Sequence, residues 1–439
     1  MKYTFILLLV VLQTISVSTK GQQLLQSGPM VGYSTMSEVG LWVQTKQSAD
    51  VYIEYWEKGK QEKWQTFTYT TQKHEAYSAH LIADQVKAGK HYEYALYING
   101  KEQKLPYPLV FETQVHWQWR ADPPNFKFAM GSCNYVNEPE TDRPGTPYGG
   151  EYVIFQSIQA RKPNFMLWLG DNTYLRETDW NSKTGIYHRY THTRSLTEMQ
   201  ALLGSTHHYA IWDDHDFGPN NSDRSFWNKE LTKAAFKRFW MNPNYVNEGI
   251  TGTFQWADVQ FFLLDNRYFR SPNHRVTGEK SILGLAQEEW LIDALKSSQA
   301  SFKFIAVGGQ FINTNADFEN HALFQAERER ILGKIRKEKI EGVVFLSGDR
   351  HHTELSRLQE NDHVYPIYDF TVSPLTSGTH VQRDEPNRNF VEGTLVDKRN
   401  FGEIEVTGKF RNRTATLRVF DSQGKLLWEK VIKQEELSY

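Results

Sequence analysis

Cysteine is the residue type that this sequence most clearly lacks. The 439 residues contain one cysteine, Cys133, so no disulfide can form within the chain. An excess of charge of either sign is also absent, since 50 lysine and arginine residues stand against 52 aspartate and glutamate residues. This balance excludes the strongly basic surface of many nucleic-acid-binding proteins and the composition of an acidic tail.

Long hydrophobic runs are absent as well. The apolar run Phe5–Leu12 follows the positively charged Lys2 and precedes the small residues Ser16–Ser18. This run is much shorter than the roughly 20 apolar residues that a membrane-spanning helix needs. The pattern is typical of a signal peptide and predicts that residues 1–20 are removed from an exported protein, periplasmic or secreted, with no remaining transmembrane segment. In such a protein Cys133 is a buried apolar residue, a thiol that pairs with another molecule, or a thiol that takes part in the chemistry of the protein.

Residues 24–115 carry short segments in which polar and apolar residues alternate. The clearest are Glu38–Gln44, Ala49–Trp56 and His91–Ile98, and Asn99-Gly100 after the last of them is typical of a hairpin turn. This pattern predicts an all-β sandwich of the immunoglobulin or fibronectin type over residues 24–115. The proline-containing segment Ala121–Asn125 interrupts the pattern, so we place a domain boundary there.

Residues 125–439 show a different pattern. Apolar runs of strand length alternate with amphipathic stretches, which is typical of an α/β domain whose sheets are covered on both faces. The clearest runs are Phe165–Leu169, Phe302–Val307 and Gly342–Leu346, and helical spacing appears at 290–295 and 331–335. Near the end, residues 401–406 and 415–431 predict closing antiparallel strands with a turn at Ser422-Gln423-Gly424.

Five strand-like runs lead directly into reactive side chains: Phe126–Cys133, Phe165–Tyr174, Ala210–Asp216, Phe261–Arg267 and Gly342–His352. Each motif alone is also typical of an ordinary strand-to-turn transition, where aspartate is common. In α/β proteins, however, the loops at the carboxyl ends of strands meet in one crevice. A cluster of thiol, phenol, carboxylate and imidazole groups in one place needs cations to offset its charge, so the pattern predicts a metal site.

The order and spacing of these motifs match a known family. The motifs are Gly-Asp-Asn-Thr-Tyr at 170–174, Trp-Asp-Asp-His-Asp at 212–216, Leu-Asp-Asn-Arg-Tyr-Phe-Arg at 264–270, Leu-Gly-Leu-Ala-Gln-Glu-Glu-Trp-Leu at 283–291 and Leu-Ser-Gly-Asp-Arg-His at 346–351. Together they resemble the PhoD-like alkaline phosphatases of the calcineurin-like metallophosphoesterase group, which are similar in fold to purple acid phosphatases. The resemblance runs from about Phe126 to about Leu355. It implies a four-layer α-β-β-α sandwich for residues 125–439, and the preceding β-sandwich resembles the N-terminal domain of many members.

The resemblance also implies a set of metal ligands. Cys133 occupies the first ligand position and, with Tyr174 and His351, is expected to bind one Fe³⁺ ion. Asp171 is expected to bridge from this iron to a neighbouring site. In that site Asp349 and a residue of the Asp214 loop are expected to hold one or two Ca²⁺ ions through oxygen atoms.

Two departures from the related metallophosphoesterases affect this second site. Asp214 stands where those enzymes have asparagine, so the sequence leaves open whether Asp214, Asn220 or Asn221 supplies the ligand. The segment Gly308–Phe311 occupies the region of a strand-end histidine that is absent here. Loss of a nitrogen ligand favours calcium over zinc.

These features lead to a functional hypothesis, which is hydrolysis of a small phosphate ester by a hydroxide ion that the metals generate. We expect His215 to contact the phosphate or act as general acid, and Asn172 and Arg350 to bind the substrate. Arg267 is expected to clamp the phosphate, and its alternative is an ion pair with Asp265 or another acid.

The sequence leaves two other functions as alternatives. One is a phosphodiesterase acting on lipid, nucleotide or wall-polymer diesters with the same cluster, because only the shape of the pocket separates the two activities. The other is a non-catalytic protein that binds a surface polymer through its aromatic residues. Aromatic residues make up 14% of the chain, but at this density they are usually core residues.

Overall fold

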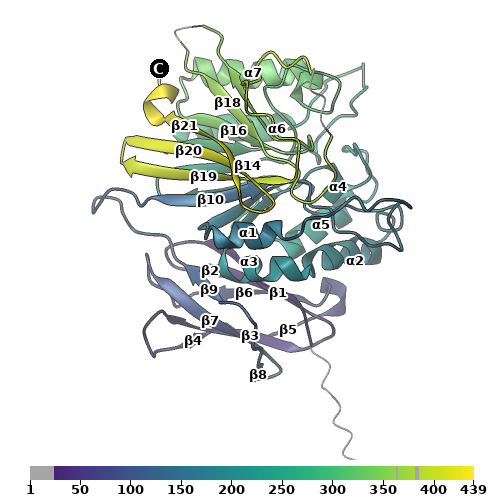
Figure 1. Cartoon of the computed structure of the whole chain (residues 1–439), viewed down its shortest axis with the longest axis vertical. Helices are drawn as coiled ribbons and strands as arrows, with labels where there is room; N and C mark the ends of the chain where they lie inside the picture. Colours follow the sequence, from purple (N-terminus) through teal and green to yellow (C-terminus); the bar gives the residue numbers. More distant parts are fainter. Residues whose placement is uncertain (1–23, 362–363, 381–384) are drawn as a thin grey trace, which may run out of the picture.

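The structure is a computed structural model of the whole chain, and it describes residues 24–361, 364–380 and 385–439. The regular structure of these residues consists of three β-sheets and their covering helices (Figure 1). The predicted signal peptide lies outside the described residues. Within the described ranges, no helix is both long enough and apolar enough to cross a membrane.

The largest sheet has nine strands and contains the first three reactive loops. Its order is β21 (Leu426–Lys433), β20 (Asn412–Asp421), β19 (Asn400–Lys409), β10 (Phe126–Gly131), β11 (Phe165–Leu169), β12 (His207–Ile211), β1 (Leu25–Ser34), β2 (Val39–Thr45) and β6 (Ser78–Ala83). The central strands β10, β11 and β12 are parallel, so their carboxyl ends lie at one edge. Strands β19, β20 and β21 add to β10 in antiparallel order, as the alternation near the end of the sequence predicts.

A second sheet of six strands delivers the other two reactive loops. Its order is β13 (Gly252–Trp256), β14 (Val259–Leu263), β15 (Lys303–Ala306), β16 (Val343–Ser347), β18 (Ile367–Thr371) and β17 (Glu354–Leu358). Strands β14, β15, β16 and β18 are parallel. The third sheet lies in the N-terminal part and contains β4 (Trp64–Gln65), β3 (Asp50–Glu57), β7 (His91–Ile98) and β8 (Lys101–Glu102), with β5 (Tyr69–Thr70) on β3 and β9 (Val110–Glu112) on β7.

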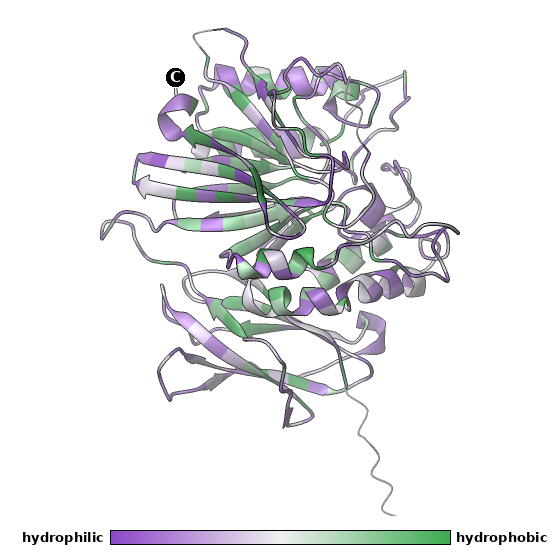
Figure 2. Cartoon of the chain, viewed as in Figure 1, coloured by the Kyte–Doolittle hydropathy of each residue, from purple (hydrophilic) through white to green (hydrophobic). Residues whose placement is uncertain are grey.

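Aromatic side chains fill the space between the two larger sheets. Phe128 of β10 stacks on Phe165 of β11 with ring centroids 4.8 Å apart. Both rings meet Phe261 of β14 edge-on, at 5.1 and 5.2 Å. Figure 2 shows largely apolar strands in the middle of these sheets, whereas the β19–β20 hairpin carries hydrophilic segments. The core therefore lies between the sheets and holds them face to face.

The helices cover the outer faces of the same two sheets. They are α1 (Ile154–Ala160), α2 (Lys183–Arg194), α3 (Gln200–Ser205), α4 (Asp214–Phe217), α5 (Lys229–Phe239), α6 (Leu285–Ser297) and α7 (Gln325–Lys337). Trp168 of β11 points away from the other sheet and contacts Phe155 of α1, with centroids 6.0 Å apart. Phe262 of β14 in the same way contacts Trp290 of α6. Since successive residues of a strand face opposite sides, the layers follow the order helix, sheet, sheet, helix.

The N-terminal strands divide between two sheets that share one apolar core, which includes Val31, Leu41, Ile53 and Leu96. Strands β1, β2 and β6 extend the nine-stranded sheet, because β1 pairs in parallel with β12 at Val31 and His207. The N-terminal segment is thus continuous with the sheet that carries the reactive loops. The immunoglobulin or fibronectin type stays a prediction.

The hairpin turn at Asn99-Gly100 is confirmed. The two residues join β7 to β8 and have φ angles of 49° and 72°. A two-residue turn with positive φ at both positions matches the twist of its strands, and asparagine followed by glycine is the favoured pair. The pattern of the sequence predicted this turn correctly because it depends on local backbone conformation alone.

Candidate metal centre

The reactive loops meet at the carboxyl ends of the parallel strands. Cys133 follows β10, Asp171 and Tyr174 follow β11, and the acidic run 213–216 follows β12 and forms the start of α4. From the second sheet, residues 348–352 follow β16. The facing arrangement of the two sheets brings the ends of both sets of strands to one edge of the molecule.

Three groups of side chains in this place have ligand atoms within 4.8 Å of one another. The groups are Cys133, Asp171 and His351; Asp171, Asp214 and His215; and Asp213, Asp214 and Asp349. Asp171 belongs to the first and second groups, and Asp214 belongs to the second and third. The Tyr174 hydroxyl joins the first group, at 3.2 Å from Asp171 Oδ2 and 3.4 Å from His351 Nε2. The sites are therefore adjacent and share carboxylates, as in a cluster of metal ions.

Several candidate ligands have an unusual backbone conformation. Cys133, Asp171, Asp349 and His351 have φ angles of 57°, 49°, 68° and 56°. This left-handed region is uncommon for residues with a Cβ and costs on the order of 1 kcal/mol or more for each one. The surrounding sheets must supply the free energy that holds these loops. Such strain accumulates at functional sites, where side chains have to point at a common ligand.

The electrostatics of the cluster support a cation. Burial and the charges of neighbouring acids, first among them Asp214, raise the pKa of Asp171 well above its ordinary value. Burial and the charge of Asp213 do the same to Asp349, and burial raises the pKa of the Cys133 thiol. These groups carry negative charge together near neutral pH only if positive charge lies between them. Thiol, phenol, imidazole and carboxylate groups are all metal ligands, so the donor set fits metal ions.

Hydrogen bonds orient two of the candidate ligands. The carbonyl oxygen of Gly378 lies 2.6 Å from Nδ1 of His351 and accepts its proton, which leaves Nε2 free to face the cluster. The Ser373 hydroxyl lies 3.1 Å from the Cys133 sulfur and donates to it. The same hydroxyl accepts from the backbone N–H of His351 at 2.9 Å. Ser373 thereby connects the end of β18 to both ligands.

A cleft of about 640 Å³ opens onto the cluster. Asp214, His215, Asp349 and His351 form one part of its wall. The rest of the lining is Tyr148, Asn220, Asn221, Asn273, His274, Ala316, Asp317, Phe318, Glu319, Leu323, Arg350 and His380. A space of this size holds a phosphate ester together with its leaving group.

The three residues proposed for the second site lie close together. The carboxylate of Asp214 accepts from the N–H of His215 at 2.9 Å and from the N–H of Asn221 at 2.6 Å. Asn220 and Asn221 line the cleft, whereas Asp214 belongs to two of the three donor groups. The His215 ring stacks on that of Tyr174 at 4.2 Å and reaches the cleft. The geometry therefore favours Asp214 as the ligand and leaves the amides in the wall.

Arg267 does not reach the cleft, in contrast to the expected phosphate clamp. Its side chain is 0% exposed, and its guanidinium lies 2.5 Å from Asp213 and 2.5 Å from Glu319. Arg267 donates to Asp265 through its backbone N–H and not through its guanidinium. The structure agrees with the alternative prediction, in which Arg267 forms an ion pair with an acid other than Asp265. Strand-end position alone did not show which way the guanidinium points.

Arg350 and Asn172 differ from each other in their relation to the cleft. Arg350 lines it, but its guanidinium forms an ion pair with Glu385 at 2.5 Å and also donates to Gln310. Asn172 points away from the cleft, since its amide donates to the carbonyl of Ile211 at 2.7 Å. The expectation that Asn172 contacts substrate therefore finds no support, because its side chain lies behind the cluster.

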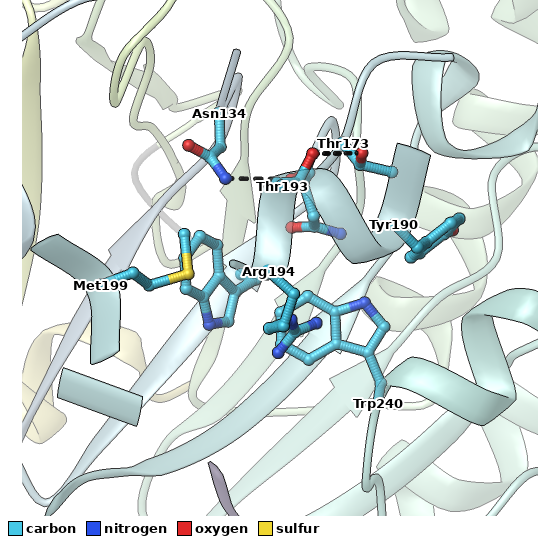
Figure 3. A pocket seen from close by; sticks show the side chains of 9 residues that line it. Asn134, Thr173, Tyr190, Thr193, Arg194, Met199 and Trp240 are labelled. Carbon is cyan, nitrogen blue, oxygen red and sulfur yellow. Dashed lines mark hydrogen bonds between the residues drawn. The ribbon is translucent and has the colours of Figure 1, made fainter. Parts of the chain in front are cut away.

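Behind the cluster, Asn172 borders a separate cavity. Figure 3 shows this cavity with Arg194 and Trp240 in its lining. Arg194 lies there against the ring of Trp240, with 4.0 Å between its guanidinium carbon and the ring centroid. Asn172 Oδ1 and Trp240 Nε1 have no partner among the described residues. The free space is about 10 Å³, close to the roughly 10–15 Å³ that one water needs. This cavity suits a structural water between the acceptor and the donor.

A glycine explains why no histidine follows β15. A Cβ on Gly308 would lie 2.6 Å from Cγ of Asp213 and 2.5 Å from the amide of Asn266. Any side chain at this position would displace the Asp213 carboxylate. Because the Gly308 backbone lies so close to Asp213, position 308 cannot carry a ligand side chain, and the Asp213 carboxylate occupies that space.

Ser373, Tyr148 and His380 are site residues that the sequence analysis missed. The run Ile367–Val372 ends at Ser373 in the same way as the five recognised runs, so this signal was present. Tyr148 has no such signal, because it lies in an irregular loop. Its hydroxyl is within hydrogen-bonding distance of His351 Nδ1 at 3.2 Å and of His380 Nε2 at 3.0 Å.

Comparison with solved structures defines the class of fold. A structure of PhoD superposes with a TM-score of 0.73 at 18% identity and covers 93% of this chain and 89% of that chain. A purple acid phosphatase from yellow lupin (Lupinus luteus) seeds gives 0.68 at 11% identity, with 93% and 74% covered. The fold is that of the metallophosphoesterases, with mixed sheets.

Comparison with protein families then identifies the chain. A family model described as PhoD-like phosphatase matches residues 128–417, well over half of the sequence, so the chain belongs to this family. A model described as a domain of unknown function (DUF7800) matches residues 22–114. Alkaline phosphatase D of Bacillus subtilis (strain 168) is 23% identical over an alignment of 340 residues, and the match covers 64% of this chain and 54% of that protein. The chain thus matches about half the length of this relative.

Proposed function

We propose that this chain is an exported, metal-dependent phosphatase that hydrolyses small phosphate esters and releases inorganic phosphate. The observation that carries the proposal is the sharing of Asp171 and Asp214 among three adjacent donor groups beside the cleft. Metal ions bound there would neutralise the ester oxygens and provide hydroxide near neutral pH. Family membership and the relative named alkaline phosphatase D support the same reaction. The predicted signal peptide supports export.

The donor types support Fe³⁺ and Ca²⁺ as the metals. Cys133, Tyr174 and His351 offer a thiolate, a phenolate and an imidazole, a set of strong donors that suits a trivalent iron. Asp213, Asp214 and Asp349 offer only oxygen atoms, which suit calcium. Asp171 lies between the two sets and connects them.

Residues around the donors have separate tasks in this proposal. His215 reaches the cleft beside Asp214, so its ring N–H donates to an oxygen of the ester or of its leaving group. Arg267 is a positioning residue, since it holds Asp213 and Glu319 and is buried. Tyr148 and Ser377 contact Nδ1 of His351 and keep its Nε2 directed at the cluster.

Hydrolysis of p-nitrophenyl phosphate by the native protein tests the proposal. We expect Asp171→Asn to lose about 100-fold or more of kcat/KM, because one shared ligand is removed from two donor groups. Asp317→Asn is the matched control, since Asp317 is an exposed carboxylate of the cleft wall outside the donor groups. Equal rates for wild type and Asp171→Asn would exclude the cluster as the active site.

The bis-ester of p-nitrophenol separates the two candidate activities. A higher kcat/KM for the monoester supports a phosphatase. A higher kcat/KM for bis(p-nitrophenyl) phosphate would show instead that the protein is a phosphodiesterase that uses the same donor groups. Metal analysis of the same preparation measures iron and calcium, and the absence of both metals from an active sample would refute the assignment of the ions.

A further inference from the structure

An exposed patch of aromatic and basic side chains lies far from the cleft. It consists of Val115, Trp119 and Arg120 in the connection between β9 and β10, and of Lys409, Phe410 and Arg411 at the tip of the β19–β20 hairpin. Trp119 is 100% exposed, Phe410 41% and Val115 40%. We refer to these six residues as the aromatic–basic patch.

Backbone hydrogen bonds attach the two segments of the patch to each other. The N–H of Phe410 donates to Asp122 at 3.1 Å, and the N–H of Gly408 donates to Asn125 at 3.1 Å. The buried guanidinium of Arg413 donates to the carbonyls of Pro123 and Pro124. The patch is therefore a built surface and not a loose end of the chain.

The conformation at Trp119 directs its indole into solvent. The N–H groups of Arg120 and Ala121 both donate to the carbonyl of Trp117, which closes a tight turn around Trp119. Trp119 occupies the left-handed region with φ of 63°, which is unfavourable for a bulky residue. The Trp117 ring packs on Phe410 at 5.2 Å and supports the turn. The fold thus maintains a strained turn that presents a large apolar ring to the outside.

The charged side chains around these rings are mostly basic. Arg120, Lys409 and Arg411 are exposed, and no ion pair involves any of them within the described part of the chain. The Arg411 guanidinium lies 5.4 Å from the centre of the Phe410 ring. Asp122 is the only acid in segments 114–125 and 408–412, and it already accepts from a backbone N–H. Cations flanking apolar rings match a surface that offers anionic headgroups above an apolar layer.

The patch and the catalytic edge lie at opposite ends of the same strands. The connection that carries Trp119 leads into the amino end of β10, whereas Cys133 follows its carboxyl end. In Figure 1 the β19–β20 hairpin lies on the left and α4 on the right of the sheet. A surface that binds the patch would therefore leave the cleft open to solvent.

We propose that the aromatic–basic patch docks the protein on a lipid bilayer with anionic headgroups. Trp119 and Phe410 enter the interface between headgroups and acyl chains, and Arg120, Lys409 and Arg411 contact the lipid phosphates. Trp is the side chain that most favours this interface, because its ring is apolar and its N–H is polar. The inference is independent of the reaction that the cleft catalyses.

Co-sedimentation with vesicles tests the docking. The full-length protein is mixed with vesicles of two parts phosphatidylcholine to one part phosphatidylglycerol, and with phosphatidylcholine alone. We expect binding to the anionic vesicles that decreases with salt, and about tenfold weaker binding for Trp119→Ser. Arg411→Glu should weaken it by about tenfold or more, because it changes the charge by two. Trp227→Ser is the matched control, since Trp227 is 68% exposed near the start of α5. Lys183→Glu on α2 is the control for charge.

Phospholipids brominated on the acyl chains identify the depth of the contact. If these lipids quench the tryptophan fluorescence of the wild-type protein but not that of Trp119→Ser, the Trp119 side chain enters the bilayer. Wild-type protein that stays in the supernatant with both vesicles overturns the proposal, and so does unchanged binding of Trp119→Ser. Binding without quenching, or equal binding to a polyanion such as heparin, overturns it in favour of an acidic polymer as the partner.

Discussion

Replacement of Arg267 by methionine distinguishes a structural role of this arginine from the phosphate clamp. Methionine has a similar unbranched chain but no charge and no donor. The guanidinium is 0% exposed and lies 2.5 Å from Asp213 and 2.5 Å from Glu319. Arg267→Met therefore leaves the buried Asp213 without its nearest cation, and Glu319 keeps only Arg270, at 3.8 Å. Asp214, at 4.0 Å, loses a more distant cation.

The expected loss of stability follows from this burial. Breaking a buried ion pair by removal of one partner costs about 3–5 kcal/mol, because a charge stays in the interior without compensation. Since about 1.4 kcal/mol corresponds to a tenfold change in an equilibrium constant, the ratio of folded to unfolded protein should fall by roughly 100-fold to several thousand-fold. Exposed ion pairs are worth about 0–1 kcal/mol, so an effect of this size is specific to burial.

Urea unfolding followed by tryptophan fluorescence measures this loss. The protein is kept in a chelator, so that metal binding adds nothing to the free energy of unfolding. Arg275→Met is the control, since Arg275 is exposed, and it should stay within about 0.5 kcal/mol of wild type. The double variant Arg267→Met/Glu319→Gln should recover part of the loss, because one of the unpaired charges is then removed. A wild-type free energy of unfolding for Arg267→Met, together with a raised KM for phosphate esters, would refute the structural role and restore the clamp.

Two further predictions concern acid stability and metal content. Burial lowers the pKa of His207 to about 4 and that of His208 to about 3, and each neutral ring accepts one N–H, from Glu112 and Trp168 respectively. Between these pKa values and the ordinary 6.5, the unfolded chain binds more protons than the folded protein. The free energy of unfolding is therefore highest above pH 6.5 and falls by about 1.4 kcal/mol per histidine for each pH unit below it. His208→Gln should reduce this slope in urea titrations, and an unchanged slope would contradict the assignment. Cys133→Ser should lose bound iron and most activity when purified without added metal, and full iron content by elemental analysis would remove Cys133 from the ligands.

Local pattern predicted much of the fold because strand and turn signals depend on neighbouring residues. The apolar runs at 165–169, 302–307 and 342–346 are strands, and the Asn99-Gly100 turn is present. Periodicity does not report which strands pair at long range. The pairing of β1 with β12 joins residues far apart in sequence, so the continuity of the N-terminal strands with the large sheet was not predicted.

The same distinction holds at the candidate metal centre. Strand-end position predicted that Cys133 and Asp171 come together, because parallel strands in one layer deliver their loops to one edge, and His351 joins them from the facing sheet. Side-chain direction is set by contacts between layers, so the sequence did not place Asn172 behind the cluster or Arg267 between two acids. Ser373 had a readable signal at the end of β18, whereas Tyr148 reaches His351 from an irregular loop.

The sequence by itself determined that Cys133 has no partner for a disulfide within the chain and that reactive residues end a series of apolar strands. Both conclusions rest on composition and local order. Only the tertiary structure decided which atoms meet at the cluster. Two sheets had to pack face to face before the thiol of Cys133, which follows β10, lay beside the hydroxyl of Ser373, which follows β18. Ligand geometry depends on packing between layers, and packing is a property of the whole chain.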